Sequence, residues 1–555
     1  MLKDYFEVPN KPAIKSGNIL SCDFTDHETF IPQPLDYTRG TIATYVDCNG
    51  LIKTSGVSDT ELVINGDFSD GLNGWSSHNG SILELQDGKA KVTTVGNQGW
   101  IKRTDLPIQS GKTYFCKAEI TNALNPTIFI NGTQNQLNPM PLISGNLYGG
   151  YITTTGNDAT FYIRGNNTDG EVSLIDNVSV KEVDLNVPRI DYTTEIGKAK
   201  ELQKPSLLFE PQSTNYFRFS EDFAQTYWSK QNNPTVNSNQ TISPEGIQNA
   251  DALVSANATS EQYIYNSTVI SVTSGDDVTI SCFVKKLDYD YFHLRFTATG
   301  SVFTAASVWY NISNGTLGTV ETGITAKIED YGNGWYRCSA TRRATGTGSG
   351  RVRLQLASAD NTAFVTGDGT KGTFVYGAQF EIQRHVTSYI PTSGSTVTRN
   401  GEICNNAGQL GVFNDTEGVL YLEAKALING GVNREITLTS GASTNIIRLR
   451  YSSTTSRFEA FLRGGGGTIQ SLSRSALTQD VYRKIALVYD SNEFAMWIDG
   501  SKQSFVSTTN LPIGLNEFEF ELNGASFFYG KVREVKVFRR ALTDSELTEL
   551  TNNIV

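Results

Sequence analysis

Apolar and polar residues alternate along short segments through most of this chain. Examples are ILELQDGKAKVTT (82–94), GKTYFCKAEI (111–120) and PTIFINGT (126–133), each bounded by Gly, Asn, Asp or Pro. Alternation of period two places every second side chain on one face, as in a half-buried β-strand. Evenly spaced short strands between turn signals are typical of β-sandwiches and jelly rolls. The chain is therefore predicted to be all-β.

A helical pattern stands out only near the C-terminus. Thr543 or Asp544 can cap the N-terminus of a helix, and Leu547 and Leu550 then fall on one of its faces. We expect one short C-terminal helix packed on a sheet.

The chain of 555 residues is too long for one hydrophobic core, so several domains are expected. The phrase LDYTRGTIATYVDCNGLI (35–52) contains a hairpin signal, and NVPRIDY (186–192) resumes it after a distinct module. This order predicts an insertion, with residues 35–58 and 184–205 side by side as paired strands. The predicted units are a 1–34 extended N-terminal attachment arm, 35–60 and 184–204 β-platform segments, a 61–183 jelly roll, a 205–404 larger jelly roll and a 405–555 sandwich.

Charge and cysteine usage narrow the function. The net charge of −11 and the absence of a basic run argue against a nucleic-acid partner. No run of 18 apolar residues occurs, so no membrane insertion is expected, and the first residues lack the apolar core of a signal peptide. The six cysteines are widely spaced and fit a chain folded in a reducing cytoplasm.

The 61–183 module carries two specific phrases. The opening pattern N-G-D-F-x-x-G-x-x-G-W runs from Asn65 to Trp75, and I-D-N-V runs from Ile175 to Val178. These phrases resemble jelly-roll carbohydrate-binding modules appended to xylanases and glucanases. The resemblance implies a glycan-binding face, and the candidate glycan-binding residues are Trp100, Arg103, Tyr114, Tyr162 and Arg164. Trp100 fits a core position and an exposed one about equally well.

The same resemblance implies one structural Ca²⁺ between the first and last strands, with Asp67 and Asp176 as candidate ligands. The alternative is that Asp67 caps a turn and Asp176 ends a strand. Four other tryptophans are predicted to be core residues: Trp75, Trp228, Trp335 and Trp497.

The 205–404 module repeats the order of the first. SEDFAQTYWSK (220–230) echoes GDFSDGLNGWSS (66–77), and GTFVYGAQFEIQ (372–383) echoes the closing strands. Its phrases SLLFEPQSTNYFRFSEDF (206–223), WYNISNGTLG (309–318), IEDYGNGWYRCS (328–339) and TSYIPTSGSTVTRN (387–400), together with 35–52 and 186–192, are similar to tail or head-spike fibre proteins of tailed bacteriophages.

The last module resembles the laminin-G or concanavalin-like lectin sandwich. The resemblance is carried by W-I-D-G at 497–500 and by the closing pattern from Gly530 to Leu547. Some sandwiches of this class are glycanases, whose catalytic strand carries spaced carboxylates. Glu517, Glu519 and Glu521 are the only local counterpart, and a solvated strand face is the favoured interpretation.

These resemblances predict a non-enzymatic structural virion protein, a fibre or spike appendage assembled in the host bacterial cytoplasm. Its expected partners are other virion proteins, bound through the N-terminal arm, and a host surface glycan. By analogy it forms a homo-oligomer, a trimer. The alternatives are a glycan-cleaving enzyme with accessory binding modules and a bacterial surface adhesin.

Overall fold

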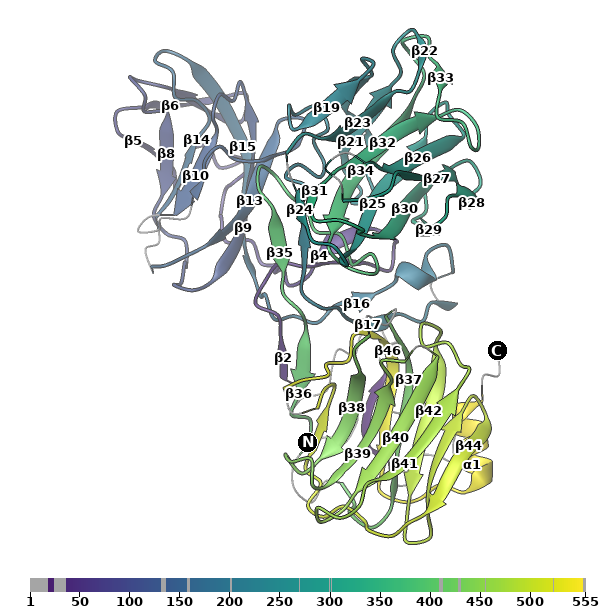
Figure 1. Ribbon diagram of the computed structural model, residues 1–555. Coiled ribbons are helices and arrows are strands. Elements are labelled where there is room, and N and C mark those ends of the chain that lie inside the picture. Colours follow the sequence, from purple (N-terminus) through teal and green to yellow (C-terminus); the bar gives the residue numbers. More distant parts are fainter. Residues whose placement is uncertain are drawn as a thin grey trace.

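The computed structural model describes residues 18–23, 36–130, 136–156, 160–199, 202–268, 270–298, 300, 302–408, 413–427, 431–454, 456–522 and 524–552. Nearly all of its regular structure is β-strand, arranged as three sandwiches joined by a small platform (Figure 1). In Figure 1 the two jelly rolls stand next to one another, and the C-terminal sandwich lies below them. The predicted all-β, multidomain fold is confirmed.

The first jelly roll consists of two antiparallel sheets. The five-stranded sheet has the order β11-β10-β14-β8-β5 and the six-stranded sheet the order β12-β13-β9-β15-β7-β6. Their strands are β5 (Ser76–His78), β6 (Ile82–Gln86), β7 (Lys89–Thr93), β8 (Trp100–Arg103), β9 (Thr113–Thr121), β10 (Thr127–Ile130), β11 (Gln136–Leu137), β12 (Leu142–Ser144), β13 (Leu147–Thr153), β14 (Phe161–Arg164) and β15 (Val172–Val183).

The second jelly roll repeats this strand order. Its sheets are β19-β23-β32-β26-β27-β28 and β20-β21-β34-β25-β30-β29. Their strands are β19 (Trp228–Gln231), β20 (Thr235–Ile242), β21 (Gln248–Val254), β23 (Tyr263–Asn266), β25 (Asp277–Lys286), β26 (Tyr291–Phe296), β27 (Ala306–Asn311), β28 (Thr316–Val320), β29 (Ile324–Asp330), β30 (Trp335–Arg343), β32 (Val352–Ala357) and β34 (Gly372–Glu381). Short ribbons pair β18 (Ser213–Asn215) with β35 (Val397–Arg399), β22 (Thr259–Ser260) with β33 (Val365–Thr366), and β24 (Ile270–Val272) with β31 (Gly348–Gly350).

Details of the two jelly rolls also match. Trp75 and Trp228 are both buried, and each donates its indole N–H to a backbone carbonyl, of Asn65 at 3.0 Å and of Phe219 at 2.9 Å. In both modules a bulge interrupts the pairing of the last long strand, β15 or β34, with the central strand, β9 or β25. At the bulge, the backbone N–H of Val178 donates to the Gly66 carbonyl, and that of Ala378 donates to the Ser220 carbonyl, in the loop ahead of each tryptophan. The predicted internal repeat is confirmed by topology and local geometry.

The C-terminal sandwich pairs a larger sheet, β16-β17-β46-β37-β42-β43-β44, with a five-stranded sheet, β41-β40-β39-β38-β45. Its strands are β16 (Ile190–Asp191), β17 (Ser206–Phe209), β37 (Gly418–Ala426), β38 (Arg434–Thr439), β39 (Ile446–Tyr451), β40 (Arg457–Arg463), β41 (Gln470–Ser475), β42 (Arg483–Tyr489), β43 (Glu493–Ile498), β44 (Ser501–Ser507), β45 (Glu517–Glu519) and β46 (Gly530–Phe538). The helix α1 (Asp544–Thr551) begins after Thr543, whose side chain and that of Glu546 form a reciprocal cap. Leu547 and Leu550 are buried, as predicted.

Three strands of the larger sheet, β1 (Asn18–Asp23), β16 and β17, come from parts of the chain that were assigned elsewhere. Leu207 and Phe209 of β17 pair with β46 and lie in the core of the C-terminal sandwich. The predicted boundary at residue 205 is therefore wrong, because Ser206–Phe209 belongs to the C-terminal sheet. Within the predicted arm, β1 also pairs with β46, whereas residues 1–17 and 24–34 lie outside the described part of the chain.

The platform brings the two halves of the interrupted phrase together. The hairpin of β3 (Thr44–Val46) and β4 (Ile52–Thr54) lies against the second segment, since Tyr192 donates its backbone N–H to Val46 at 2.9 Å. The chain also enters and leaves the inserted module at adjacent points, because Val57, just before the module, is bridged to Val183, its last residue. The predicted adjacency is confirmed. The two segments meet mainly through single hydrogen bonds and side chains, however, and not through the predicted paired strands.

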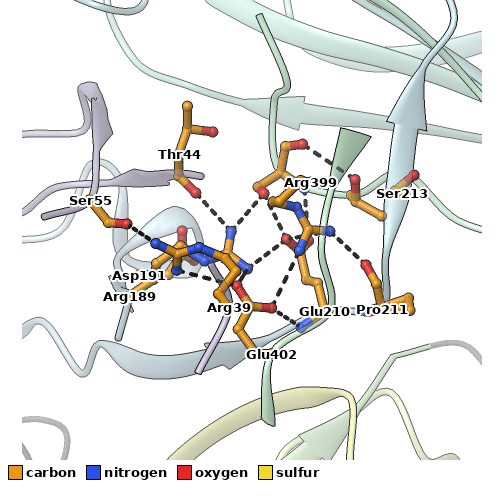
Figure 2. Close-up of polar contacts among 12 residues, drawn as sticks. Arg39, Thr44, Ser55, Arg189, Asp191, Glu210, Pro211, Ser213, Arg399 and Glu402 are labelled. Atoms are coloured by element: carbon orange, nitrogen blue, oxygen red, sulfur yellow. Dashed lines mark hydrogen bonds and ion pairs between the residues drawn. The ribbon is translucent and has the colours of Figure 1, made fainter. Parts of the chain in front are cut away.

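A buried cluster of charges, which we call the ion cluster, lies at the centre of this platform. It contains Arg39, Arg189, Arg399, Glu210 and Glu402, whose side chains are at most 5% exposed. Figure 2 shows the guanidinium of Arg189 reaching both carboxylates, at 2.9 Å from Glu210 and 2.5 Å from Glu402. Four of the phrases that carry the bacteriophage resemblance, 35–52, 186–192, 206–223 and 387–400, contribute Arg39, Arg189, Glu210 and Arg399 to this cluster.

Each member of the ion cluster is also held by hydrogen bonds. Ser388 donates both its backbone N–H and its hydroxyl to Glu210, at 2.7 and 2.6 Å. Burial alone would raise the pKa of Glu210, but Arg399 and Arg189 outweigh that effect and hold the pKa well below its usual range. The short ribbon of β2 (Asp36–Thr38) and β36 (Ile403–Asn405) flanks the cluster. The cluster therefore ties the platform to the end of the second jelly roll.

Candidate functional site

An aromatic surface covers the outer side of the five-stranded sheet in the first jelly roll. On β8 and β14, Ile101 and Ile163 point into the core, so the alternate residues Trp100, Tyr162 and Arg164 face outward. Trp100 and Arg164 are half-buried there, whereas Tyr162 is 9% exposed because Phe129 stacks on its ring. We call the outward set the aromatic face; its members are His78, Trp100, Phe129, Tyr162 and Arg164.

The rings of the aromatic face touch in a continuous row. Trp100 meets Phe129 edge-on with ring centroids 5.2 Å apart, and Phe129 stacks on Tyr162 at 4.5 Å. His78 lies 4.8 Å from Tyr162 at the other end of the row. Ring contacts of this kind hold each side chain in place before a ligand arrives, which lowers the entropy cost of binding.

Polar groups border the row of rings. The guanidinium of Arg164 lies 4.6 Å from the Trp100 ring centroid and donates a hydrogen bond to Thr127 Oγ1 at 3.0 Å. Lys102 lies on the same face, directly opposite Tyr162 in the strand register. Burial, and then the charge of Lys102, lower the pKa of His78 below its usual value, so the imidazole is neutral at neutral pH. The face thus combines apolar planes with hydrogen-bond donors.

Tyr114 is not part of this surface. Its side chain is fully buried in the core of the first jelly roll, and its hydroxyl accepts a hydrogen bond from the Gln109 backbone N–H at 2.9 Å. Because Tyr114 and Cys116 are two residues apart on β9, both point inward. The predicted placement of Tyr114 on the glycan-binding face is therefore wrong.

Arg103 is also turned away from the surface. It shares its side of β8 with the core residue Ile101, and it is 4% exposed. Its guanidinium pairs with Asp105, donates to the Ile64 carbonyl and lies 5.8 Å from the Trp75 ring centroid. Arg103 therefore closes the end of the sandwich, and its prediction as a glycan contact is wrong.

The two aspartates proposed as calcium ligands each have another partner. Asp67 accepts hydrogen bonds from the backbone N–H and hydroxyl of Ser69, which is the turn-capping alternative. Asp176 lies 3.2 Å from the ammonium of Lys89, a group that repels a cation. Within the described residues, no three His, Cys, Asp or Glu side chains are gathered in a way that could hold a metal. Both carboxylates thus have protein partners in this structure, and the structural Ca²⁺ stays a prediction.

Sequence reasoning missed His78 and Phe129. Phe129 was recognisable, because it alternates with the core residues Ile128 and Ile130 in a predicted strand. His78 could not be placed from its own segment, since only its pairing opposite Trp100 brings it to the face. Trp75, Trp228, Trp335 and Trp497 are all buried, as predicted.

A second polar surface lies on the five-stranded sheet of the C-terminal sandwich. Phe518 and Phe520 enter the core, and Glu517 and Glu519 share the opposite side of β45. Glu521 follows the strand, is 5% exposed and accepts a hydrogen bond from Asn405, so the predicted solvated strand face is wrong for Glu521. Burial, and then the neighbouring Glu517 and Glu521 charges, raise the pKa of Glu519 to about 7. The carboxylates are close enough to influence one another's protonation.

A cavity of about 250 Å³ lies where the platform, the second jelly roll and the C-terminal sandwich meet. Its walls hold charges of both signs that are already paired, with Lys531 2.6 Å from Asp191 and Lys327 2.5 Å from Glu329. Lys425 and Arg337 also line the cavity; burial lowers the pKa of Lys425 to about 8, and Arg337 donates a hydrogen bond to the Thr387 carbonyl at 2.8 Å. Separately, no helix in the described part of the chain is long and apolar enough to cross a bilayer.

Comparison with known families identifies the C-terminal module. Residues 427–548 match the family model described as the concanavalin A-like lectin/glucanases superfamily. This match agrees with the sandwich in the structure and confirms the predicted class of that module. No curated protein matches the chain.

Solved structures show low overall similarity. The leech intramolecular trans-sialidase is 20% identical at a TM-score of 0.23, and the match covers 26% of this chain and 24% of that one. A carbohydrate-binding module, CBM40, of the Ruminococcus gnavus IT-sialidase bound to α2,3-sialyllactose is 17% identical at a TM-score of 0.23, covering 27% and 93%. The tandem CBM22 modules of Paenibacillus barcinonensis Xyn10C are 12% identical at a TM-score of 0.20, covering 59% and 98%. At these values the likenesses carry no functional argument, and the chain spans about a quarter of the trans-sialidase.

Proposed function

We propose that this chain is a non-catalytic, glycan-binding structural protein, a fibre or spike appendage of a tailed bacteriophage. The observation that carries the binding part is the aromatic face, where Trp100, Phe129 and Tyr162 form one row bordered by Arg164. Pyranose rings present apolar C–H faces and polar hydroxyl edges. A row of aromatic planes flanked by hydrogen-bond donors complements both parts of a sugar.

The virion part rests on the bacteriophage resemblance, and the position of its phrases supports it. Arg39, Arg189 and Arg399 come from three of those phrases and meet in the ion cluster. The resemblance therefore concerns the structural centre of the chain and not a detachable surface loop. In this proposal the N-terminal arm binds other virion proteins, the protein is located in the virion as a homo-oligomer, and the aromatic face contacts a host surface glycan.

Gold-labelled antibodies against the whole chain test the virion assignment. The proposal predicts label at one defined position on purified particles, on the head or on the tail, and none on particles from which the gene is deleted. Label found only in the unassembled fraction of the lysate would contradict it and would leave the adhesin alternative.

Glycan cleavage is the second candidate function, and it is favoured by the raised pKa of Glu519. Alternate residues of a strand are about 6.6 Å apart, close to the spacing of paired carboxyl groups in glycosidases. A carboxyl group with a pKa of about 7 could serve as the general acid beside an ionised neighbour. If the chain depolymerises a host polysaccharide and the E517Q/E519Q/E521Q variant does not, this candidate replaces the non-catalytic one.

A further inference from the structure

The second jelly roll carries tyrosines and arginines on the outer side of the sheet that corresponds to the aromatic face. Ile264 of β23 and Leu294 of β26 point into the core, so Tyr263, Tyr265 and Arg295 face outward. Arg353 of β32 lies on the same side, opposite Tyr265 in the register. The strands β23 and β32 occupy the places that β8 and β14 occupy in the first jelly roll.

The rings of Tyr263 and Tyr265 are each covered by a guanidinium. Arg353 lies 4.0 Å from the Tyr263 ring centroid, and Arg351 lies 5.1 Å from that of Tyr265. Stacking of this kind orients the planar guanidinium and leaves its N–H groups directed sideways. The arrangement resembles Arg164 over Trp100, with a higher density of positive charge.

The positive charges of this surface exceed the negative ones. Arg295 and Arg353 lie directly opposite each other on neighbouring strands, where like charges repel. Glu261 is the carboxylate that they share, at 4.0 Å from Arg295 and 3.0 Å from Arg353. Burial, and then the charges of Arg295 and Arg353, lower the pKa of His293 to about 3. A chain of net charge −11 thus keeps a local positive surface.

The neighbouring part of the same sheet is closed. Trp309 and Gln355 donate hydrogen bonds to the carbonyls of Thr362 and Ala363, so this loop covers both side chains, and His293 stacks on Trp309 at 4.3 Å. The arginine side stays accessible, with the Arg295 and Arg353 side chains 30% and 21% exposed, whereas Tyr263 is buried beneath Arg353 at 8% exposure.

We propose that this surface, formed by Glu261, Tyr263, Tyr265, Arg295, Arg351 and Arg353, is a second glycan-binding site that is selective for carboxylate-bearing sugars. Charge complementarity selects an acidic ligand, because a carboxylate accepts paired hydrogen bonds from a guanidinium that is already oriented by a tyrosine ring. The inference rests on the proposed function only in taking the ligand to be a glycan.

Isothermal titration of the full-length chain with hexamers of galacturonic acid, mannuronic acid and hyaluronan tests this site. Each hexamer is compared with its methyl ester, which keeps the ring and removes the charge. At least one acidic hexamer is expected to bind about tenfold or more tighter than its ester, and the R295Q/R353Q variant is expected to lose about tenfold or more of that affinity.

Two control variants separate this inference from the proposed function. Arg343 lies on the other sheet of the same module with its side chain 60% exposed, so R343Q removes an equal charge at another place and is expected to leave binding unchanged. W100A is expected to abolish binding of neutral glycans and to spare acidic ones. No preference for any acid over its ester, or an equal loss in R343Q and in R295Q/R353Q, would overturn the second site and leave the first intact. Loss of acid binding in W100A would assign both ligands to the aromatic face.

Discussion

The guanidinium of Arg189 lies 2.5 Å from the carboxylate of Glu402, and both side chains are fully buried. The two residues come from segments on either side of the second jelly roll, so their contact holds the platform closed. Removing one partner of a buried pair leaves the other charge without compensation, and the cost is about 3–5 kcal/mol.

The free energy of unfolding of the platform is therefore expected to be about 3–5 kcal/mol lower in the R189M variant than in the native chain. Urea denaturation, followed by tryptophan fluorescence, measures it. R343M is the matched control, because Arg343 pairs with Asp277 on the surface, where such a pair contributes about 0–1 kcal/mol. Equal effects of the two substitutions would show that the ion cluster does not stabilise the fold.

The pH dependence of stability is expected to report Glu245. Burial, and then the Glu221 charge, raise its pKa from the ordinary 4.5 to about 8. A carboxyl group whose pKa is higher in the folded state contributes stability that is fully present below pH 4.5 and is lost as pH rises through about 8. Asp251, with its pKa raised to about 7 mainly by burial, acts in the same direction.

Replacing Glu245 by Gln removes the first of these titrations. Calorimetry between about pH 5 and 9 should show the Tm of the native chain falling more steeply with pH than that of E245Q. E84Q serves as the control, because the Glu84 side chain is 55% exposed. Parallel Tm profiles for the native chain and E245Q would refute the shifted pKa.

Tyr114 and Trp100 should separate stability from binding. Y114F leaves the backbone N–H of Gln109 without its acceptor and is expected to cost about 1 kcal/mol of stability, with glycan affinity unchanged. Thermal unfolding and glycan titration on the same preparation measure both quantities. A weaker glycan affinity in Y114F, at unchanged stability, would show that Tyr114 contacts the glycan and would contradict its assignment to the core.

Much of the fold could be predicted from local pattern. Alternation predicted the strands. The indole of Trp75, which lies in the turn phrase of the first module, was correctly predicted to be in the core. The phase of the alternation also indicates that Tyr114 and Arg103 point toward the core. Each lies two residues from a core residue on the same strand, Tyr114 from Cys116 and Arg103 from Ile101. Their residue types suit a glycan-binding surface, but their positions in the alternation place them on the core side.

Long-range pairing could not be predicted in this way. Nothing within Ser206–Phe209 distinguishes a strand of the second jelly roll from one that pairs with β46, because either neighbour would bury Leu207 and Phe209. The ion cluster could not be predicted from the sequence for the same reason. Arg39, Arg189 and Glu402 are single charges in polar segments, and only the closed platform brings them into contact.

The aromatic face is the central claim, and Trp100 tests it most directly. A neutral glycan selected by array screening of the full-length chain is titrated against the native protein, W100A and F505A. Phe505 is 64% exposed on the C-terminal sandwich, so F505A removes an accessible aromatic ring from another module. The account predicts a loss of affinity of at least about tenfold in W100A and none in F505A. Unchanged affinity in W100A, or the same loss in both variants, would contradict it.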